Sequence, residues 1–67
     1  MKNYFKQNLK QLRKENGYSQ KELAEKLNST IKTISHWETG YSEPSIQQIL
    51  ELCVIFNIST DELLCKQ

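Results

Sequence analysis

Three signatures of a helix start recur along this chain of 67 residues. In each of them a serine is followed three positions later by glutamate or glutamine: Ser19 with Glu22, Ser45 with Gln48, and Ser59 with Glu62. This pattern, the capping box, satisfies two backbone amides that otherwise have no partner at the N-terminus of a helix. Because the signal occurs three times in so short a chain, it predicts an all-α fold.

Apolar residues at helical spacing indicate five helices joined by short turns. Phe5, Leu9 and Leu12, for example, define one buried face of the first helix. The first four helices are expected to end at residues that tolerate a left-handed backbone, namely Gly17, Asn28, Gly40 and Asn57. The expected helices span about 4–16, 20–27, 31–39, 46–56 and 60–65. A chain of this length forms one domain at most, so we expect a compact five-helix bundle over residues 1–67.

The stretch from Ser19 to Gly40 has the pattern of two short helices with a tight turn between them. Ser29 or Thr30 can cap the second of these helices. At helical spacing, Ile34 and Trp37 lie together and are expected to point inward. The side chains expected to point outward are Lys32, Ser35, His36 and Thr39. A short helix with a polar outer face can enter a groove of DNA, although an ordinary surface helix has the same pattern.

The expected helix over 46–56 is apolar almost all round. Its core stripe is predicted to consist of Ile46, Ile49, Cys53 and Phe56. Further apolar residues lie on its other sides: Leu50, Leu52, Val54 and Ile55. This exceeds what one side of a small bundle needs, so the helix is either central in the fold or partly covered by another subunit. The candidate dimer face combines part of this surplus with two residues near the last helix: Leu50, Val54, Ile58 and Leu64.

The net charge of the chain is only +1, but the charges are unevenly distributed. Residues 1–40 hold eight Lys or Arg and four Asp or Glu, whereas residues 41–67 hold one Lys and four Asp or Glu. The basic half contains the two-helix stretch, as expected of an end that faces a polyanion, although a small sample can be asymmetric by chance. Lys6, Lys10 and Lys14 form a basic ridge that is either simply solvated or able to lie along phosphates near a duplex.

The residues give little support to an enzyme, a metalloprotein or a secreted protein. One histidine without a convergent carboxylate or nucleophile pair forms no catalytic site. Cys53 is expected on an apolar helix face and Cys65 near the C-terminus, with no spacing that suggests zinc or a disulfide framework. No signal peptide or membrane span is apparent. We therefore expect a protein of the reducing cytoplasm that is not an enzyme and needs no metal or cofactor.

Several segments resemble the Cro/phage-repressor family of helix-turn-helix proteins, also called the XRE family. The first reads L-R-K-E-N-G-Y-S-Q-K-E-L-A-E-K-L, over residues 12–27. The second reads T-I-S-H-W-E-T-G, over 33–40, and is followed by Pro44 and by N-I-S-T-D-E-L-L, over 57–64. The resemblance covers about residues 9–64. It implies a lambda-repressor-like bundle in which the second and third helices form the helix-turn-helix, and it outweighs the interpretation as an ordinary surface helix.

The resemblance also implies roles for individual residues. Gln20 matches a glutamine that meets the phosphate backbone and braces the recognition helix. Arg13 and Glu38 match a salt bridge between the first and third helices. The residues implied to face base edges are Ile31, Lys32, Thr33 and His36. Those implied to contact the DNA backbone are Gln20, Thr30, Ser35, Tyr41 and Ser42, the last two through hydroxyls or backbone amides.

Departures from the family pattern bear on affinity. Asn28 and Ser29 stand where relatives often have Gly-Val, and Glu43 stands where they often have lysine or arginine before the proline. The implied function is a sequence-specific transcriptional regulator of double-stranded DNA, a repressor that acts as a homodimer on a palindromic operator. The alternative is an antitoxin-like or adaptor module that uses the same fold to bind another protein, in keeping with Glu43 and the near-neutral charge.

Overall fold

The computed structural model describes residues 4–66, so the outermost ends of the expected 1–67 domain lie outside the described residues. Within that range the chain forms five helices and no strand. They are α1 (Phe5–Glu15), α2 (Gln20–Lys26), α3 (Ile31–Thr39), α4 (Ile46–Phe56) and α5 (Thr60–Leu64). The prediction of an all-α, five-helix fold is therefore confirmed, and each helix end lies within one residue of the expected position.

Local sequence signals set the helix ends. All three capping boxes are formed, with each serine hydroxyl accepting from a backbone amide and each Glu or Gln side chain accepting from the serine amide. Thr30, rather than Ser29, caps α3, because its hydroxyl accepts from the Thr33 amide at 3.2 Å. Left-handed backbone, with φ between 54° and 82°, follows four of the helices, at Gly17, Asn28, Gly40 and Asn57.

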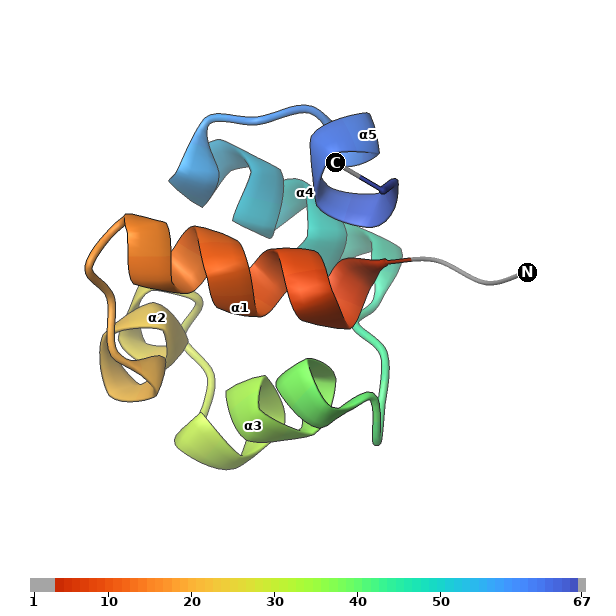
Figure 1. The fold of residues 1–67 in the computed structure, drawn as a ribbon. Coiled ribbons are helices and arrows are strands. Elements are labelled where there is room, and N and C mark those ends of the chain that lie inside the picture. Colours follow the sequence, from red (N-terminus) through yellow and green to blue (C-terminus); the bar gives the residue numbers. More distant parts are fainter. Residues whose placement is uncertain (1–3, 67) are drawn as a thin grey trace.

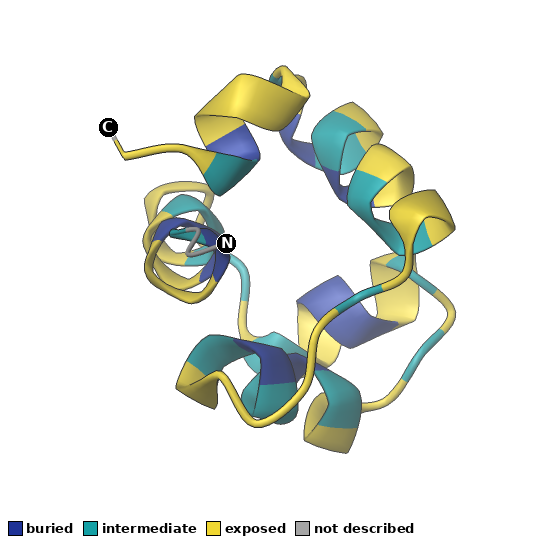
Figure 2. Cartoon of the chain, turned by 90° about the vertical axis from the view of Figure 1, so that its right-hand side faces the viewer, coloured by how far each residue is buried: buried dark blue, intermediate teal, exposed yellow. Residues whose placement is uncertain are grey.

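The helices pack around one core, and α1 lies in the middle of the molecule. α1 has α3 on one side and α5 on the other (Figure 1), while α2 packs against α3 and α4 against α5. The buried residues face inward from each helix, and the outer sides are exposed (Figure 2). The core consists of Phe5, Leu9, Leu23, Ala24, Ile34, Trp37, Leu52, Phe56 and Leu63.

α4 presents a different side to the core from the one predicted. Leu52 is completely buried, whereas Ile46, which was expected to begin the core stripe, is 78% exposed. Ile49 and Cys53 are half-buried and Phe56 is buried, so the inward face runs through positions 49, 52, 53 and 56. The prediction for Ile46 was wrong because the helix is apolar all round, and periodicity alone cannot choose between equally apolar sides.

One buried polar side chain joins the two ends of the described chain. The Asn8 side-chain amide on α1 donates to three carbonyls near the end of α5: those of Glu62 at 3.4 Å, Leu63 at 3.0 Å and Cys65 at 2.7 Å. The backbone amide of Tyr4 adds a hydrogen bond to the Leu64 carbonyl at 2.9 Å. The last carbonyls of a helix have no partner within the helix, so Asn8 supplies a C-terminal cap that the sequence analysis did not find.

Candidate nucleic-acid interface

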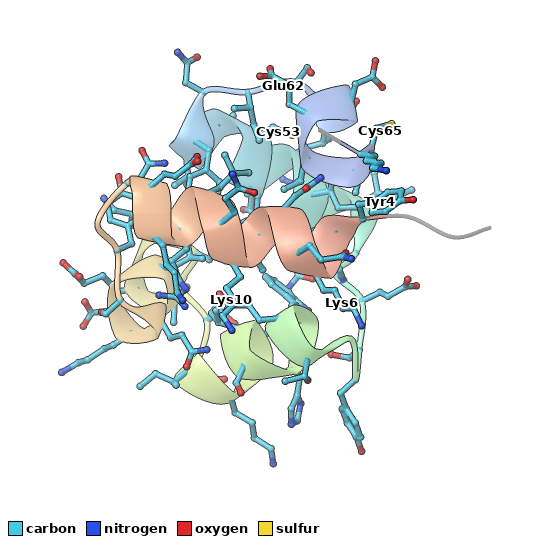
Figure 3. All side chains as sticks on the ribbon, viewed as in Figure 1. Tyr4, Lys6, Lys10, Cys53, Glu62 and Cys65 are labelled. Carbon is cyan, nitrogen blue, oxygen red and sulfur yellow. The ribbon has the colours of Figure 1, made fainter. Side chains whose placement is uncertain are left out.

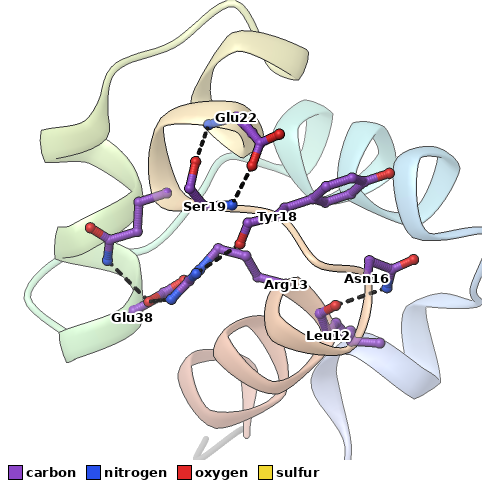
Figure 4. Close-up of polar contacts among 8 residues, drawn as sticks. Leu12, Arg13, Asn16, Tyr18, Ser19, Glu22 and Glu38 are labelled. Carbon is purple, nitrogen blue, oxygen red and sulfur yellow. Dashed lines mark hydrogen bonds and ion pairs between the residues drawn. The ribbon is translucent and has the colours of Figure 1, made fainter.

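α3 is held from its inner side by a network centred on the Glu38 carboxylate. The Arg13 guanidinium on α1 donates from Nε to Glu38 Oε2 at 2.6 Å and from Nη2 to Glu38 Oε1 at 3.1 Å. The side-chain amide of Gln20, the first residue of α2, donates to the same Oε1 at 3.1 Å. Arg13 Nη1 also donates to the Tyr18 carbonyl at 2.9 Å. Figure 4 shows α1, α2 and α3 meeting at this carboxylate.

This network is almost closed to water. Only 11% of the Arg13 side chain and 4% of the Glu38 side chain are exposed. The hydrogen bond to Glu38 raises the pKa of Arg13, so the guanidinium remains charged. Because a two-point contact between arginine and a carboxylate fixes orientation as well as distance, α3 cannot turn against α1 without breaking it. The structure thus brings together the expected salt bridge and the expected brace from Gln20.

The first turn of α3 presents three chemically different groups. Ile31 is 48% exposed, and Lys32 is exposed. Thr33 is half-buried, and its hydroxyl lies 3.0 Å from the Thr30 hydroxyl, which orients both side chains. An apolar group, an ammonium and a hydroxyl therefore occur at three successive positions that were expected to face base edges.

Near the other end of α3, two rings lie in contact at a tilt. The centroids of the His36 and Tyr41 rings lie 4.5 Å apart, with their planes tilted by 47°. Tyr41 is 79% exposed, while His36 and Ser35 are half-buried. The tyrosine ring covers part of the imidazole and restricts its orientations. The expected base contact at His36 therefore depends on a residue that the sequence assigned to the DNA backbone.

The turn after α3 limits how its residues can contact a phosphate. Gly40 adopts the left-handed backbone, with φ of 82°. The backbone amides of Tyr41 and Ser42 fold back onto the His36 carbonyl, at 2.9 Å and 3.4 Å. Both amides are engaged within the protein. Of the two kinds of donor expected here, the hydroxyls are the ones that remain for DNA.

α4 carries an exposed row of apolar side chains, which we call the α4 apolar row. Its members, Ile46, Leu50 and Val54, are four residues apart and are 78%, 48% and 80% exposed. Leu50 and Val54 belong to the candidate dimer face. Ile58 and Leu64, the other members of that face, are half-buried and pack against the core. The apolar surface that the protomer leaves open is therefore mainly on α4.

The part of the chain that the structure describes contains no grouping of His, Cys, Asp and Glu placed to hold a metal ion. Cys53 and Cys65 are both free thiols. Cys53 is half-buried, and burial raises the pKa of its thiol. Over the same residues, no helix has the length and apolar character needed to cross a bilayer.

A family model described as helix-turn-helix matches residues 9–63, which include all of α2, α3 and α4. Among curated proteins, the HTH-type transcriptional regulator ImmR of Bacillus subtilis (strain 168) is 45% identical over 58 residues. These residues are 87% of this chain and 46% of that protein. The chain spans between 29% and 52% of the length of the curated relatives that it matches.

Two solved structures share the fold along nearly the whole chain. The crystal structure of a transcriptional regulator from Listeria innocua has a TM-score of 0.89 and 33% identity, over 96% of this chain and 60% of that one. The crystal structure of SinR, a master regulator for biofilm formation, in complex with DNA has a TM-score of 0.80 and 36% identity. That comparison covers 90% of this chain and 97% of the chain in that structure.

Proposed function

The chain belongs to the helix-turn-helix family of transcriptional regulators, and on that basis we propose that it binds double-stranded DNA in a sequence-specific manner. It acts as a repressor, as a homodimer on a palindromic operator, in the cytoplasm. It is a binding protein and not an enzyme.

The observation that carries this proposal is the open outer side of α3. Ile34 and Trp37 anchor the helix from within, with 0% and 2% of their surfaces exposed. Glu38 ties the same helix to α1 and α2. The opposite side, led by the exposed Lys32, is left free by the packing of the protomer. A helix fixed in this way, with one polar side open, suits the major groove of DNA, which is wide enough to admit a helix.

The exposed groups of α3 have matching partners on base edges. Lys32 can donate to guanine O6 and N7, and Ile31 can contact a thymine methyl group. Thr33 can donate or accept, and His36 can donate to a base or a phosphate. Contacts to the DNA backbone, which position the protein without reading sequence, are assigned to Gln20, Thr30, Ser35, Tyr41 and Ser42.

A second copy of the chain supplies the selectivity that one copy lacks. One small domain contacts too few base pairs to select a site within a genome. A two-fold dimer places two recognition helices about 34–36 Å apart, on the two halves of a palindrome. The α4 apolar row is the surface assigned to the second copy. A dimer that occupies its operator excludes other proteins from the same DNA, which is the simplest physical route to repression.

The direct test selects bound duplexes from a random pool and then titrates the winning sequence with salt. We expect a palindromic sequence to be enriched. Its affinity is expected to fall linearly with salt on logarithmic axes, because lysines and arginines that bind phosphates release counterions. A pool without enrichment, or an affinity that does not respond to salt, contradicts the proposal.

Lys32 provides a residue-level test of base readout. Lys32→Ala is expected to relax the preference at one base position and to cost about 1–3 kcal/mol of discrimination, because a donor to a base edge is lost. Repeating the selection with the variant measures this. Lys14→Ala, which removes the same charge from an exposed position on α1, is expected to select the wild-type sequence. An unchanged sequence preference for Lys32→Ala would remove Lys32 from the base-reading residues.

A protein-interaction module is the second candidate, and the α4 apolar row favours it. Three exposed apolar residues on one helix side also suit the surface of another protein, and the net charge of +1 gives no overall attraction to DNA. An antitoxin-like or adaptor protein of this kind is expected to bind duplexes weakly and without a steep salt dependence. The salt titration therefore separates the two functions.

A further inference from the structure

Lys6, on α1, lies beside the C-terminal end of α3 and is not among the residues assigned to the DNA interface. A Cβ placed on Gly40 would lie 3.1 Å from Lys6 Cδ and 3.5 Å from Lys6 Nζ, so the lysine stem rests on the bare backbone of the glycine. Figure 3 shows Lys6 and Lys10 on the side of α1 that faces α3. Gly40 thus ends α3 with a left-handed backbone and also leaves room for the lysine stem.

Helix geometry independently places Lys6 on this side of α1. Arg13 marks the line of α1 that faces α3, because its guanidinium binds Glu38 at 2.6 Å. Lys6 precedes Arg13 by seven positions, so at about 100° per residue it lies only about 20° from that line. Lys10 lies about 60° from it and Lys14 about 100°. The basic ridge on α1 therefore turns away from α3 along its length, and Lys6 is its member nearest the recognition helix.

Apart from the Tyr41 and Ser42 hydroxyls, a phosphate near this end of α3 meets an unfavourable surface. The C-terminus of a helix carries a partial negative charge. The backbone amides of Tyr41 and Ser42 are already engaged in the turn. The exposed Glu43 adds a full negative charge next along the chain. A DNA strand that passes here needs a cation, and Lys6 Nζ is the cation that the fold places beside Gly40.

We propose that Lys6 binds a backbone phosphate of duplex DNA at the C-terminal end of the recognition helix. This inference rests on the proposed DNA-binding function, and it extends the interface from the helix-turn-helix onto α1. The ammonium binds one phosphodiester without touching a base, so its contribution depends on salt and not on sequence. Gly40 positions the stem, and Lys14 takes no part.

The test compares Lys6→Met and Lys14→Met in the full chain, on a mixed-sequence duplex of about 20 base pairs, or two helical turns. Methionine keeps an unbranched stem over Gly40 and removes the charge, and circular dichroism checks that each variant is folded. For Lys6→Met, the plot of log affinity against log salt is expected to be less steep by about 0.9, the value for one phosphate contact. The ratio of the wild-type affinity to the affinity of this variant should fall about 3.5-fold between 50 and 200 mM salt.

Lys14→Met and one further variant, Lys6→Arg, make the outcome decisive. Lys14→Met and Lys6→Arg are each expected to keep the wild-type slope, the first because it lies off the interface and the second because the charge remains. Equal changes for Lys6→Met and Lys14→Met would overturn the proposal, since they would indicate only diffuse attraction. An unchanged slope for Lys6→Met beside a steep wild-type slope would overturn the Lys6 contact and leave DNA binding standing. A wild-type protein without salt-dependent duplex binding would overturn both.

Discussion

Glu38 shows how one side chain can fix the orientation of a whole helix. Its carboxylate accepts hydrogen bonds from Arg13 on α1 and from Gln20 on α2, and only 4% of its side chain is exposed. The charge is therefore buried but fully paired. A buried pair of this kind adds little over a well-packed apolar pair, but removing one partner strands the other charge.

We expect Glu38→Ala to destabilise the fold by about 3 kcal/mol, because Arg13 is left as an uncompensated charge where water has little access. Urea unfolding followed by circular dichroism measures this loss. Glu25→Ala, at an exposed position on α2, is the control and is expected to change stability by less than about 0.5 kcal/mol. A loss for Glu38→Ala as small as that of the control would show that the network does not hold α3.

Asn8 is a second polar residue whose replacement is expected to be costly. Asn8→Asp keeps the shape but turns a donor into a charged acceptor facing carbonyl oxygens, so at neutral pH we expect a loss of more than about 2 kcal/mol. Acid should restore part of this loss, since protonation gives the introduced carboxyl group a hydrogen to donate. Thermal unfolding at several pH values measures both effects. A variant that is equally destabilised at neutral and acidic pH would contradict this account of the Asn8 contacts.

At the scale of helices, what could be predicted from the sequence depended on the distance over which each signal acts. Capping boxes and left-handed residues act within about four positions, so the helix ends were predictable. Asn8 binds carbonyls 54 to 57 positions away, and no local pattern indicates such a partner. The inward side of α4 was predicted only in part, because Ile46 and Leu52 are equally apolar and tertiary packing chooses between them.

In the candidate interface, too, only the features that depend on nearby residues or on the family pattern could be predicted. The resemblance to a known family supplied the expected positions on α3, and the apolar spacing correctly predicted that Ile34 and Trp37 are buried. The contact between His36 and Tyr41 could not be predicted, since it depends on how the turn after α3 folds back. The position of Lys6 against Gly40 depends in turn on how α1 packs across α3.

The capping box of α2 is expected to make this helix sensitive to acid. Hydrogen bonds from the Ser19 backbone amide and side chain hold the pKa of Glu22 below its ordinary value of 4.5. Because the pKa is lowered by folding, the stabilisation is fully present above about pH 4.5 and is lost as the pH falls through the lower folded-state value. Glu22→Gln keeps an acceptor, as Gln48 does in α4, and is expected to lose this part of the pH dependence. Melting temperatures measured from neutral pH down to about pH 3 test this, and identical acid sensitivity in both proteins would count against it.

At the scale of the whole molecule, the proposed dimer depends on the α4 apolar row. Wild-type protein is expected to have the mass of a dimer by light scattering at micromolar concentration. The Val54→Lys variant is expected to have the mass of a monomer. Val54 is 80% exposed in the protomer, and burying a lysine charge there between two subunits would be costly. Losing the second copy should weaken operator binding on the order of 100-fold. Gln11→Lys, which adds the same charge at an exposed position on α1, is the control. A wild-type protein that remains monomeric would remove the dimer from the proposed function.

The cap that Asn8 places on α5 also governs when a newly made chain can finish folding. Domains generally fold as units during synthesis. Here the first helix finds its last hydrogen-bond partners only at the end of α5. A nascent polypeptide therefore exposes one flank of α1 until translation has passed residue 65. Unfinished chains contain α3 but not the completed fold, which leaves them open to proteolysis.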